Sequence, residues 1–404
     1  MTVPRPVRFL DRRTPPHVAT LVLLTGMSAL SMNIFLPSLP GMTAYFHTEY
    51  SVMQLSVALF LLFNAILQIG IGPISDSRGR RPVILWGIAL FLLATLGCIY
   101  APTAELFLVA RMCQAVIAVA MVLTRAAVRD LYTQDKAASM IGYVTMGMAV
   151  VPMASPAVGG LLDGIFGWQA NFWLLFIFGA MSLALAYFDF GETAVRSGKS
   201  LGAQVRDYPE LLRSPRFWGY TLAAAFSSGS FYAYLGGAPY VGTVVYGMNP
   251  TELGVYFGAP AIGYFTGNFI TARLAARVGV NRMVLAGGLL IFFGVGLSMI
   301  VMTLGYGSAE TFFGFMVFIG VGNGLTIANG TAGALSVRPH LAGTASGLSG
   351  AIMLGGGAGL SALAGLLLTP GSGAMPLLWI MIITAAASVV SIVLVMRREK
   401  RLRL

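Results

Sequence analysis

Arg111 is the side chain with the clearest chemical potential, because it is the only basic residue inside a long apolar stretch, here 104–124. A guanidinium keeps its proton throughout the physiological pH range. Placing it in hydrocarbon costs at least about 2.5–3.5 kcal/mol, so such a residue usually faces the interior of a helix bundle. Snorkelling to the outer surface is the alternative. We expect a fixed positive charge inside the protein, facing away from lipid.

Asn33 lies in another apolar stretch, 18–38, at about the depth of Arg111. Counting back from residue 39, it sits roughly 9 Å below the outer edge if the stretch is helical. An asparagine can form hydrogen bonds but cannot carry a proton. No Asp or Glu lies well inside an apolar stretch, since Glu105 and Asp163 are at stretch ends. If protons bind within this part of the protein, they must therefore use one of these peripheral acids rather than residue 33.

Other reactive chemistry is sparse. The three histidines, His17, His47 and His340, all lie outside the apolar stretches, so a histidine metal site is not supported. No nucleotide-binding Gly-x-x-x-x-Gly-Lys-Ser/Thr loop occurs. No acid, base and nucleophile converge as an enzyme would need. We therefore expect no metal, no cofactor and no enzymatic activity.

The elements that must position these residues are membrane helices. The 404 residues are 57% hydrophobic and only 10% charged, whereas a soluble domain has about 25% charged residues. A helix needs about 20 apolar residues to cross the hydrocarbon core. Twelve stretches meet this length: 18–38, 52–72, 83–101, 104–124, 138–160, 168–188, 217–239, 253–273, 283–304, 311–331, 343–367 and 376–396.

Charge placement predicts the orientation of these spans. Every Lys and Arg except Arg111 falls at a terminus or on alternate connections, and positive charges are retained in the cytoplasm. The intervening connections carry acids instead, namely Glu49, Glu105, Asp163, Glu252 and Glu310. An even number of spans places both termini on one side. We therefore predict cytoplasmic N- and C-termini.

A polar stretch over 189–216 divides the chain into 1–188 and 217–404, each with six predicted helices. The stretch is predicted to be a cytoplasmic linker. Gly79 and Gly279 each precede an apolar helix at corresponding places, which indicates a duplicated six-helix unit with a site near mid-membrane between the halves. Nucleic acid is not an expected partner, because the basic residues lie between apolar segments rather than on one exposed face.

Three groups of residues resemble sequence motifs of the major facilitator superfamily, and within it the drug/proton antiporters of the bicyclomycin- and chloramphenicol-resistance type. The helix 2–3 loop signature is matched by Gly72, Asp76, Gly79, Arg80 and Arg81, with Ser77 in place of the usual basic residue. The buried arginine motif is matched by Arg111 and Gln114, with Ala115 in place of the usual glycine. The helix-five antiporter motif is matched by Pro152, Pro156, Gly159 and Gly160.

The resemblance implies an all-α membrane protein with twelve transmembrane helices in two six-helix bundles, the major facilitator fold. It implies a monomer in the inner membrane that exports hydrophobic, drug-like molecules by proton antiport, in the surrounding lipid bilayer. The informative departure is Asn33, where the family shows an aspartate that would pair with Arg111. A metabolite exporter, or a facilitator without proton coupling, is therefore the alternative.

Candidate residues for substrate binding and coupling are the polar and aromatic groups inside the predicted spans. They are Asn33, Asn64, Gln68, Arg111, Gln114, Phe231, Tyr232, Tyr234, Asn268 and Asn323. The loop and helix-five motifs are candidates for conformational switching, because glycine and proline permit turns, bends and close packing. These are Gly72, Asp76, Gly79, Arg80, Arg81, Pro152, Pro156, Gly159 and Gly160.

Overall fold

A computed structural model describes residues 8–14, 16–131, 151, 154–193, 209–338 and 341–402, and these contain helices but no strand. The N-terminal half contains α1 (Val18–Asn33), the 3-10 turn η1 (Leu36–Ser38), α2 (Leu39–Tyr45), α3 (Tyr50–Arg78), α4 (Arg80–Ile99), α5 (Ala104–Gln114), the 3-10 turn η2 (Ala115–Ile117), α6 (Ala118–Leu131), a helix over Ala154–Phe166, and α8 (Gln169–Asp189). The C-terminal half contains α10 (Pro215–Tyr240), the π-helical turn η3 (Val241–Val245), α11 (Pro250–Phe257), α12 (Ala259–Val278), α13 (Val280–Thr303), α14 (Ala309–Ser336), α15 (Ala342–Leu367) and α16 (Met375–Leu402).

Nine helices within the described residues are long and apolar enough to cross a membrane. The predicted spans over 217–239 and 253–273 are also helical, as α10 and as α11 followed by α12. The predicted span over 138–160 falls largely outside the described residues, and the helix Ala154–Phe166 contains its end. The chain is therefore an all-α, multi-pass membrane protein.

The predicted loop between the second and third spans is much shorter than expected. Residues 72 to 78 continue α3, so Gly79 alone separates α3 from α4. Gly79 has φ 97° and ψ 149°, and Gly279, between α12 and α13, has φ 90° and ψ 149°. Residues other than glycine rarely adopt a backbone conformation with such a positive φ. The same one-residue corner in both halves supports the duplicated unit.

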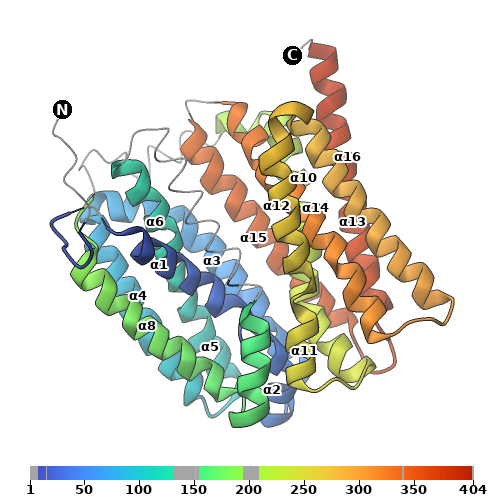
Figure 1. Cartoon of the computed structure of the whole chain (residues 1–404), viewed down its shortest axis with the longest axis horizontal. Coiled ribbons are helices and arrows are strands. Elements are labelled where there is room, and N and C mark those ends of the chain that lie inside the picture. The colour runs from blue at the N-terminus through green and yellow to red at the C-terminus, as the bar shows by residue number, and fades with distance from the viewer. Residues whose placement is uncertain are drawn as a thin grey trace.

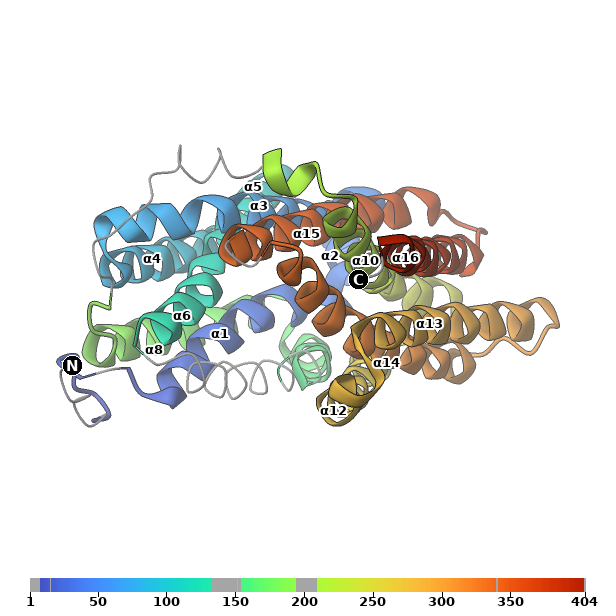
Figure 2. The ribbon, with the colours of Figure 1, turned by 90° about the horizontal axis from the view of Figure 1, so that it is seen from above.

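Each half of the chain forms one helix bundle. In the first, α4 packs against α5 and α8, α3 against α5 and α6, and α1 against α6 and α8. In the second, α14 packs against α12 and α13, while α10 packs against α14, α15 and α16. Figures 1 and 2 show these bundles as the blue-to-green and the yellow-to-red parts of the molecule. The two halves meet most extensively where α3 lies beside α15 (Figure 2).

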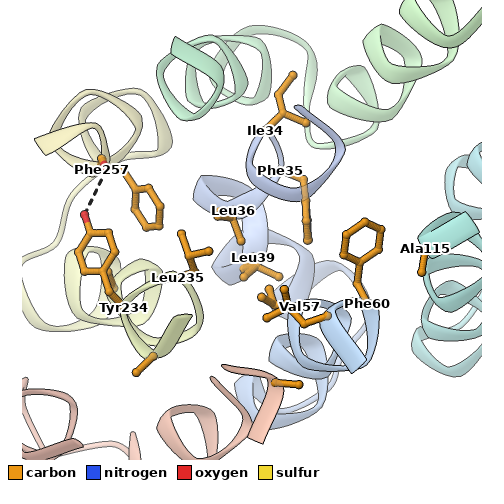
Figure 3. Packing of buried hydrophobic residues seen from close by; sticks show 14 of the residues in the cluster. Ile34, Phe35, Leu36, Leu39, Val57, Phe60, Ala115, Tyr234, Leu235 and Phe257 are labelled. Carbon is orange, nitrogen blue, oxygen red and sulfur yellow. Dashed lines mark hydrogen bonds between the residues drawn. The ribbon is translucent and has the colours of Figure 1, made fainter. Parts of the chain in front are cut away.

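A buried apolar layer joins the two bundles at the end of the molecule that carries α2 and α11 (Figure 1). Figure 3 shows this interface layer, which contains Leu36, Leu39 and Val57 from the first bundle and Tyr234, Leu235 and Phe257 from the second. Each of these side chains is buried. The bundles are therefore closed against each other at this end.

Candidate functional site

Arg111 lies near the end of α5 and its side chain has no exposed surface. Its Nη2 donates a 2.8 Å hydrogen bond to the backbone oxygen of Ser31 on α1, and its Nη1 lies 3.3 Å from the Ser31 hydroxyl. Nη1 also donates to Oε1 of Gln114 at 2.7 Å. The guanidinium thus joins α1 to α5 in the interior of the first bundle. It faces neither lipid nor the outer surface.

Two aromatic rings contact the guanidinium of Arg111. Its Cζ atom lies 4.4 Å from the ring centroid of Phe35 and 4.0 Å from that of Phe60. A desolvated cation gains about 2 kcal/mol from such a ring. Figure 3 shows these two rings directed toward the same space between their helices. The rings stabilise the positive charge where water cannot.

No carboxylate compensates this charge in the described part of the chain, where Arg111 forms no ion pair. Its buried Nε also lacks a hydrogen-bond partner there. Burying a guanidinium without an acidic partner reduces the stability of the folded protein, because the charge loses its hydration. The site therefore carries a fixed positive charge, and the Nε–H group of Arg111 can still donate a hydrogen bond.

Asn33 and Arg111 form no hydrogen bond with each other. The Nδ2 of Asn33 donates to the backbone oxygen of Ala29 at 2.7 Å, and the asparagine side chain is buried. Arg111 instead contacts Ser31 on α1 and Phe35, which lies between α1 and η1, and these two residues flank Asn33 in sequence. The two side chains therefore bond to different groups.

Gln114 extends the Arg111 contacts into α4. Its Nε2 donates to the Thr95 hydroxyl at 2.8 Å, and that hydroxyl donates to the backbone oxygen of Phe91 at 2.7 Å. The sequence-based list of site residues omitted Thr95, together with Ser31, Phe35 and Phe60. Ser31 and Phe35 had a detectable signal, because their i, i+4 spacing places them on one helix face. No sequence signal indicated that Phe60 would lie opposite Phe35.

Asn64 and Gln68 lie on α3 near the contact with α15. Gln68 donates to Oδ1 of Asn64 at 2.9 Å, and its own amide oxygen faces Gly350 of α15. A second glutamine on α3, which sequence reasoning missed, crosses between the bundles: Gln54 donates to the Ser361 hydroxyl at 2.7 Å. Tyr50 likewise donates to the backbone oxygen of Gly236 at 2.7 Å. Polar contacts therefore reinforce the α3 interface with the second bundle.

The aromatic candidates of α10 lie in the second bundle. Tyr234 is fully buried, and its hydroxyl donates to the backbone oxygen of Phe257 at 3.2 Å (Figure 3). Its ring stacks with Phe231 at 6.3 Å between centroids. Tyr232 is half-buried, with its ring against Gly357 of α15. Tyr234 therefore helps to form the interface layer, while Tyr232 packs within its own bundle.

The two asparagine candidates of the second bundle make contacts within that bundle. Asn268 is half-buried and donates to the backbone oxygen of Tyr264 at 2.8 Å. Asn323 is buried and accepts a 2.7 Å hydrogen bond from Ser227. Neither side chain forms a hydrogen bond with Arg111. The ten candidates thus divide into the Arg111 cluster, the α3 interface pair and separate groups in the second bundle.

The corner at Gly79 is held by a carboxylate that sequence reasoning missed. Glu192, just after α8, accepts hydrogen bonds from the backbone nitrogens of Arg80, at 2.8 Å, and Arg81, at 3.3 Å. A negative charge at a helix N-terminus is stabilised by the helix dipole. Arg81 in turn donates through Nε to the backbone oxygen of Phe190 at 3.0 Å. The side chain of Asp76, and the surroundings of Gly72, lie outside the described part of the structure.

An equivalent corner exists in the second bundle. Glu399, at the end of α16, accepts a 2.6 Å hydrogen bond from Nδ2 of Asn281, two residues after Gly279. It also accepts from Tyr220 at 2.9 Å and forms a 2.6 Å ion pair with Arg216. Each bundle therefore has a carboxylate from the end of its last helix at the one-glycine corner.

The helix-five glycines bring backbone against backbone at the closed end. A methyl group added at Gly160 would collide with the carbonyl of Pro250 on α11, and one added at Gly159 would collide with the carbonyl of Ile34. Pro156 contacts Gly254 of α11 through its own carbonyl. These small residues allow the bundles to approach closely. Pro152 lies outside the described residues.

Asp163 lies past the predicted fifth span, three residues after Gly160 on the same helix. Partial burial raises the pKa of its carboxyl above the ordinary value, although a hydrogen bond from Ser38 of η1 opposes this. Ser38 also accepts from Asn171 at 3.0 Å. Glu105, the other peripheral acid named above, is exposed. Asp163 is thus a half-buried acid beside the contact between the bundles.

Two packed helical bundles with a cation buried inside one of them are typical of a membrane transporter. Residues 21–361 match the family model of the Major Facilitator Superfamily. The chain belongs to the Major Facilitator Superfamily. The prediction of a transporter rather than an enzyme is confirmed.

The relatives agree with the expected subfamily. The chain is 31% identical to an uncharacterized MFS-type transporter, YdgK, of Bacillus subtilis, over 93% of this chain and 95% of the relative. It is 30% identical to a chloramphenicol resistance protein of Pseudomonas aeruginosa, over 83% of this chain and 82% of the relative. The predicted resemblance to antibiotic-resistance transporters is confirmed.

A solved structure with the same fold is that of a bacterial homolog of the human lysosomal transporter Spinster, in an inward-facing and occupied conformation. The TM-score is 0.69 at 17% identity, with 94% of each chain covered. This similarity confirms the predicted fold of two six-helix bundles.

Proposed function

We propose that this transporter exports hydrophobic, drug-like molecules across the bacterial inner membrane by proton antiport with alternating access. Relatives named for resistance to bicyclomycin, to chloramphenicol and to multiple drugs support this class of substrate. The observation that carries the mechanism is the fully buried Arg111 guanidinium, which contacts two aromatic rings and has no acid beside it among the described residues. Any charge that enters the protein would interact strongly with Arg111, because the protein interior screens electrostatic interactions weakly.

The orientation and domain boundaries belong to the same proposal. Positive charge on alternate connections supports cytoplasmic termini, with bundles over 1–188 and 217–404 joined by a cytoplasmic linker over 189–216. In that orientation the interface layer closes the outer side. Each chain would contain a complete pathway between its bundles, which supports a monomer.

The proton carrier in this proposal is Asp163 rather than residue 33. An asparagine cannot bind and release a proton, and Asn33 is bonded to its own helix. Asp163 is half-buried and lies three residues after Gly160, whose backbone contacts Pro250 of α11. A raised pKa lets it take up a proton at a higher pH than an exposed aspartate would. Its protonation state would thereby be linked to closure of the outer side.

A facilitator without proton coupling is the second candidate function. The absence of a carboxylate partner for Arg111 in the described region favours it. The two candidates are separated by reconstituting the protein in proteoliposomes and following chloramphenicol with and without an imposed pH gradient. Antiport requires accumulation that depends on the gradient, whereas a facilitator only equalises the two concentrations.

A further inference from the structure

A groove of about 690 Å³ lies between the start of α10 and the C-terminal end of α16. Figure 1 shows this end of α16 projecting beyond the neighbouring helices. Four arginines line the groove: Arg213, Arg397, Arg398 and Arg401. Its remaining wall is largely apolar and includes Trp218 and Leu394. The groove therefore combines a cationic end with an apolar one.

The four arginines are uncompensated. None of their side chains has a hydrogen bond or ion pair with any residue that the structure describes. The nearest acid in sequence, Glu399, is engaged by Arg216, Tyr220 and Asn281. Residues 394, 397, 398 and 401 follow the i, i+3, i+4, i+7 spacing of one helix face, and residue 399 lies off that face. The groove thus presents positive charge with no competing carboxylate.

The apolar part of the groove continues onto the membrane-facing surface. Leu394 is 58% exposed and precedes the arginines by one helical turn. Trp218 is anchored by a 2.8 Å hydrogen bond from its indole nitrogen to the backbone oxygen of Leu212. Tryptophan is enriched where hydrocarbon meets the lipid headgroups. The arginines therefore lie at headgroup level, with the apolar wall running into the bilayer.

We propose that this groove binds an anionic phospholipid. The lipid phosphate lies among the four arginines, whose guanidinium groups can form charge-assisted, bidentate hydrogen bonds with phosphate oxygens. One acyl chain runs along Trp218 and Leu394. Basic pockets beside membrane helices favour anionic headgroups. The groove should prefer a membrane lipid to free phosphate, because its apolar wall can contact an acyl chain that free phosphate lacks. The proposal rests on the membrane fold and does not depend on the transported substrate.

The test is native mass spectrometry of the purified full chain in detergent, titrated with phosphatidylglycerol or phosphatidylcholine. The groove variant is Arg397→Gln, Arg398→Gln and Arg401→Gln combined. Its matched control replaces three arginines near the α12–α13 corner: Arg273→Gln, Arg277→Gln and Arg282→Gln. We expect the groove variant to bind phosphatidylglycerol at least about tenfold more weakly, about 1.4 kcal/mol, and the control within about twofold of the unmodified protein.

Three results would overturn the proposal: unchanged phosphatidylglycerol binding by the groove variant, an equal loss in the control, or equal binding of phosphatidylcholine. Displacement of the lipid by millimolar inorganic phosphate would instead assign a free-phosphate site and also contradict it. The single variant Arg401→Gln, at an exposed position in the last helical turn, serves if the triple variant does not fold. It should lower the affinity measurably and in the same direction.

Discussion

Glu192 and Glu399 occupy equivalent places in the two halves of the chain, each at a corner where one glycine separates two helices. Glu192 accepts hydrogen bonds from the first backbone nitrogens of α4, and Glu399 accepts one from Asn281 at the start of α13. The glycines at these corners have φ values of 97° and 90°. The last helix of each bundle is thereby tied to the corner between its second and third helices.

Glu192→Ala should lower the apparent melting temperature, because it removes a carboxylate from a helix N-terminus, worth about 1 kcal/mol. Glu399→Ala should have a larger effect, since it also leaves Arg216 without its ion-pair partner. The control is Glu210→Ala, whose ion pair with Arg338 is half-exposed, 47% and 44% by side chain, and worth less than about 1 kcal/mol. Equal melting temperatures for all three variants in detergent would contradict this role.

Arg111→Met should reduce transport at least tenfold while changing the melting temperature little. Methionine fills a similar volume between Phe35 and Phe60, and removing a buried guanidinium offsets the lost hydrogen bonds. The comparison needs both transport in proteoliposomes and thermal unfolding. Near-normal transport would show that the charge has no functional role. A large fall in melting temperature would show that Arg111 mainly supports the fold.

Gly160→Ala should slow transport about tenfold or more, because its methyl group would collide with the Pro250 carbonyl and hold the bundles apart. The matched control is Gly359→Ala on α15, where an added methyl group meets no neighbouring atom within 4 Å. Substrate binding should persist in both variants, measured by equilibrium binding in detergent. Comparable transport by the two variants would exclude this glycine from the closing motion.

The sequence predicted much of the fold but only part of the site. Apolar length and charge alternation located the helices, because hydrocarbon thickness and membrane insertion act on local sequence. Counting residues along helices predicts similar depths for Asn33 and Arg111. The pairing of Arg111 with Ser31, and its enclosure by Phe60 of α3, depend on how three helices rotate against one another. That rotation is set by tertiary packing, so the sequence-based list omitted these residues.

The loop prediction was wrong for a similar reason. Residues 72–78 contain glycine, proline and charge, which normally favour a turn, yet they continue α3. The corner needs only Gly79, because Glu192 supplies the capping interaction that a longer loop would otherwise provide. This carboxylate lies more than 100 residues away in sequence, so no local pattern indicates it.

Asn33→Asp should make substrate affinity depend more strongly on pH between about pH 6 and 8. A carboxylate at this depth can ionise beside the permanent charge of Arg111, whereas the asparagine cannot. The measurement is chloramphenicol affinity at several pH values for the unmodified protein and the variant. Identical pH profiles would show that residue 33 is isolated from the charge of Arg111.

The most direct test of proton antiport is gradient-driven accumulation of chloramphenicol in proteoliposomes, comparing the unmodified protein with Asp163→Asn and Glu105→Gln. The proposed function predicts accumulation that requires the pH gradient. Accumulation should be lost in Asp163→Asn, which cannot release a proton, and retained in Glu105→Gln, whose side chain is exposed. Transport by the unmodified protein that is equal with and without the gradient would contradict antiport. Full gradient-driven accumulation by Asp163→Asn would show that another group carries the proton.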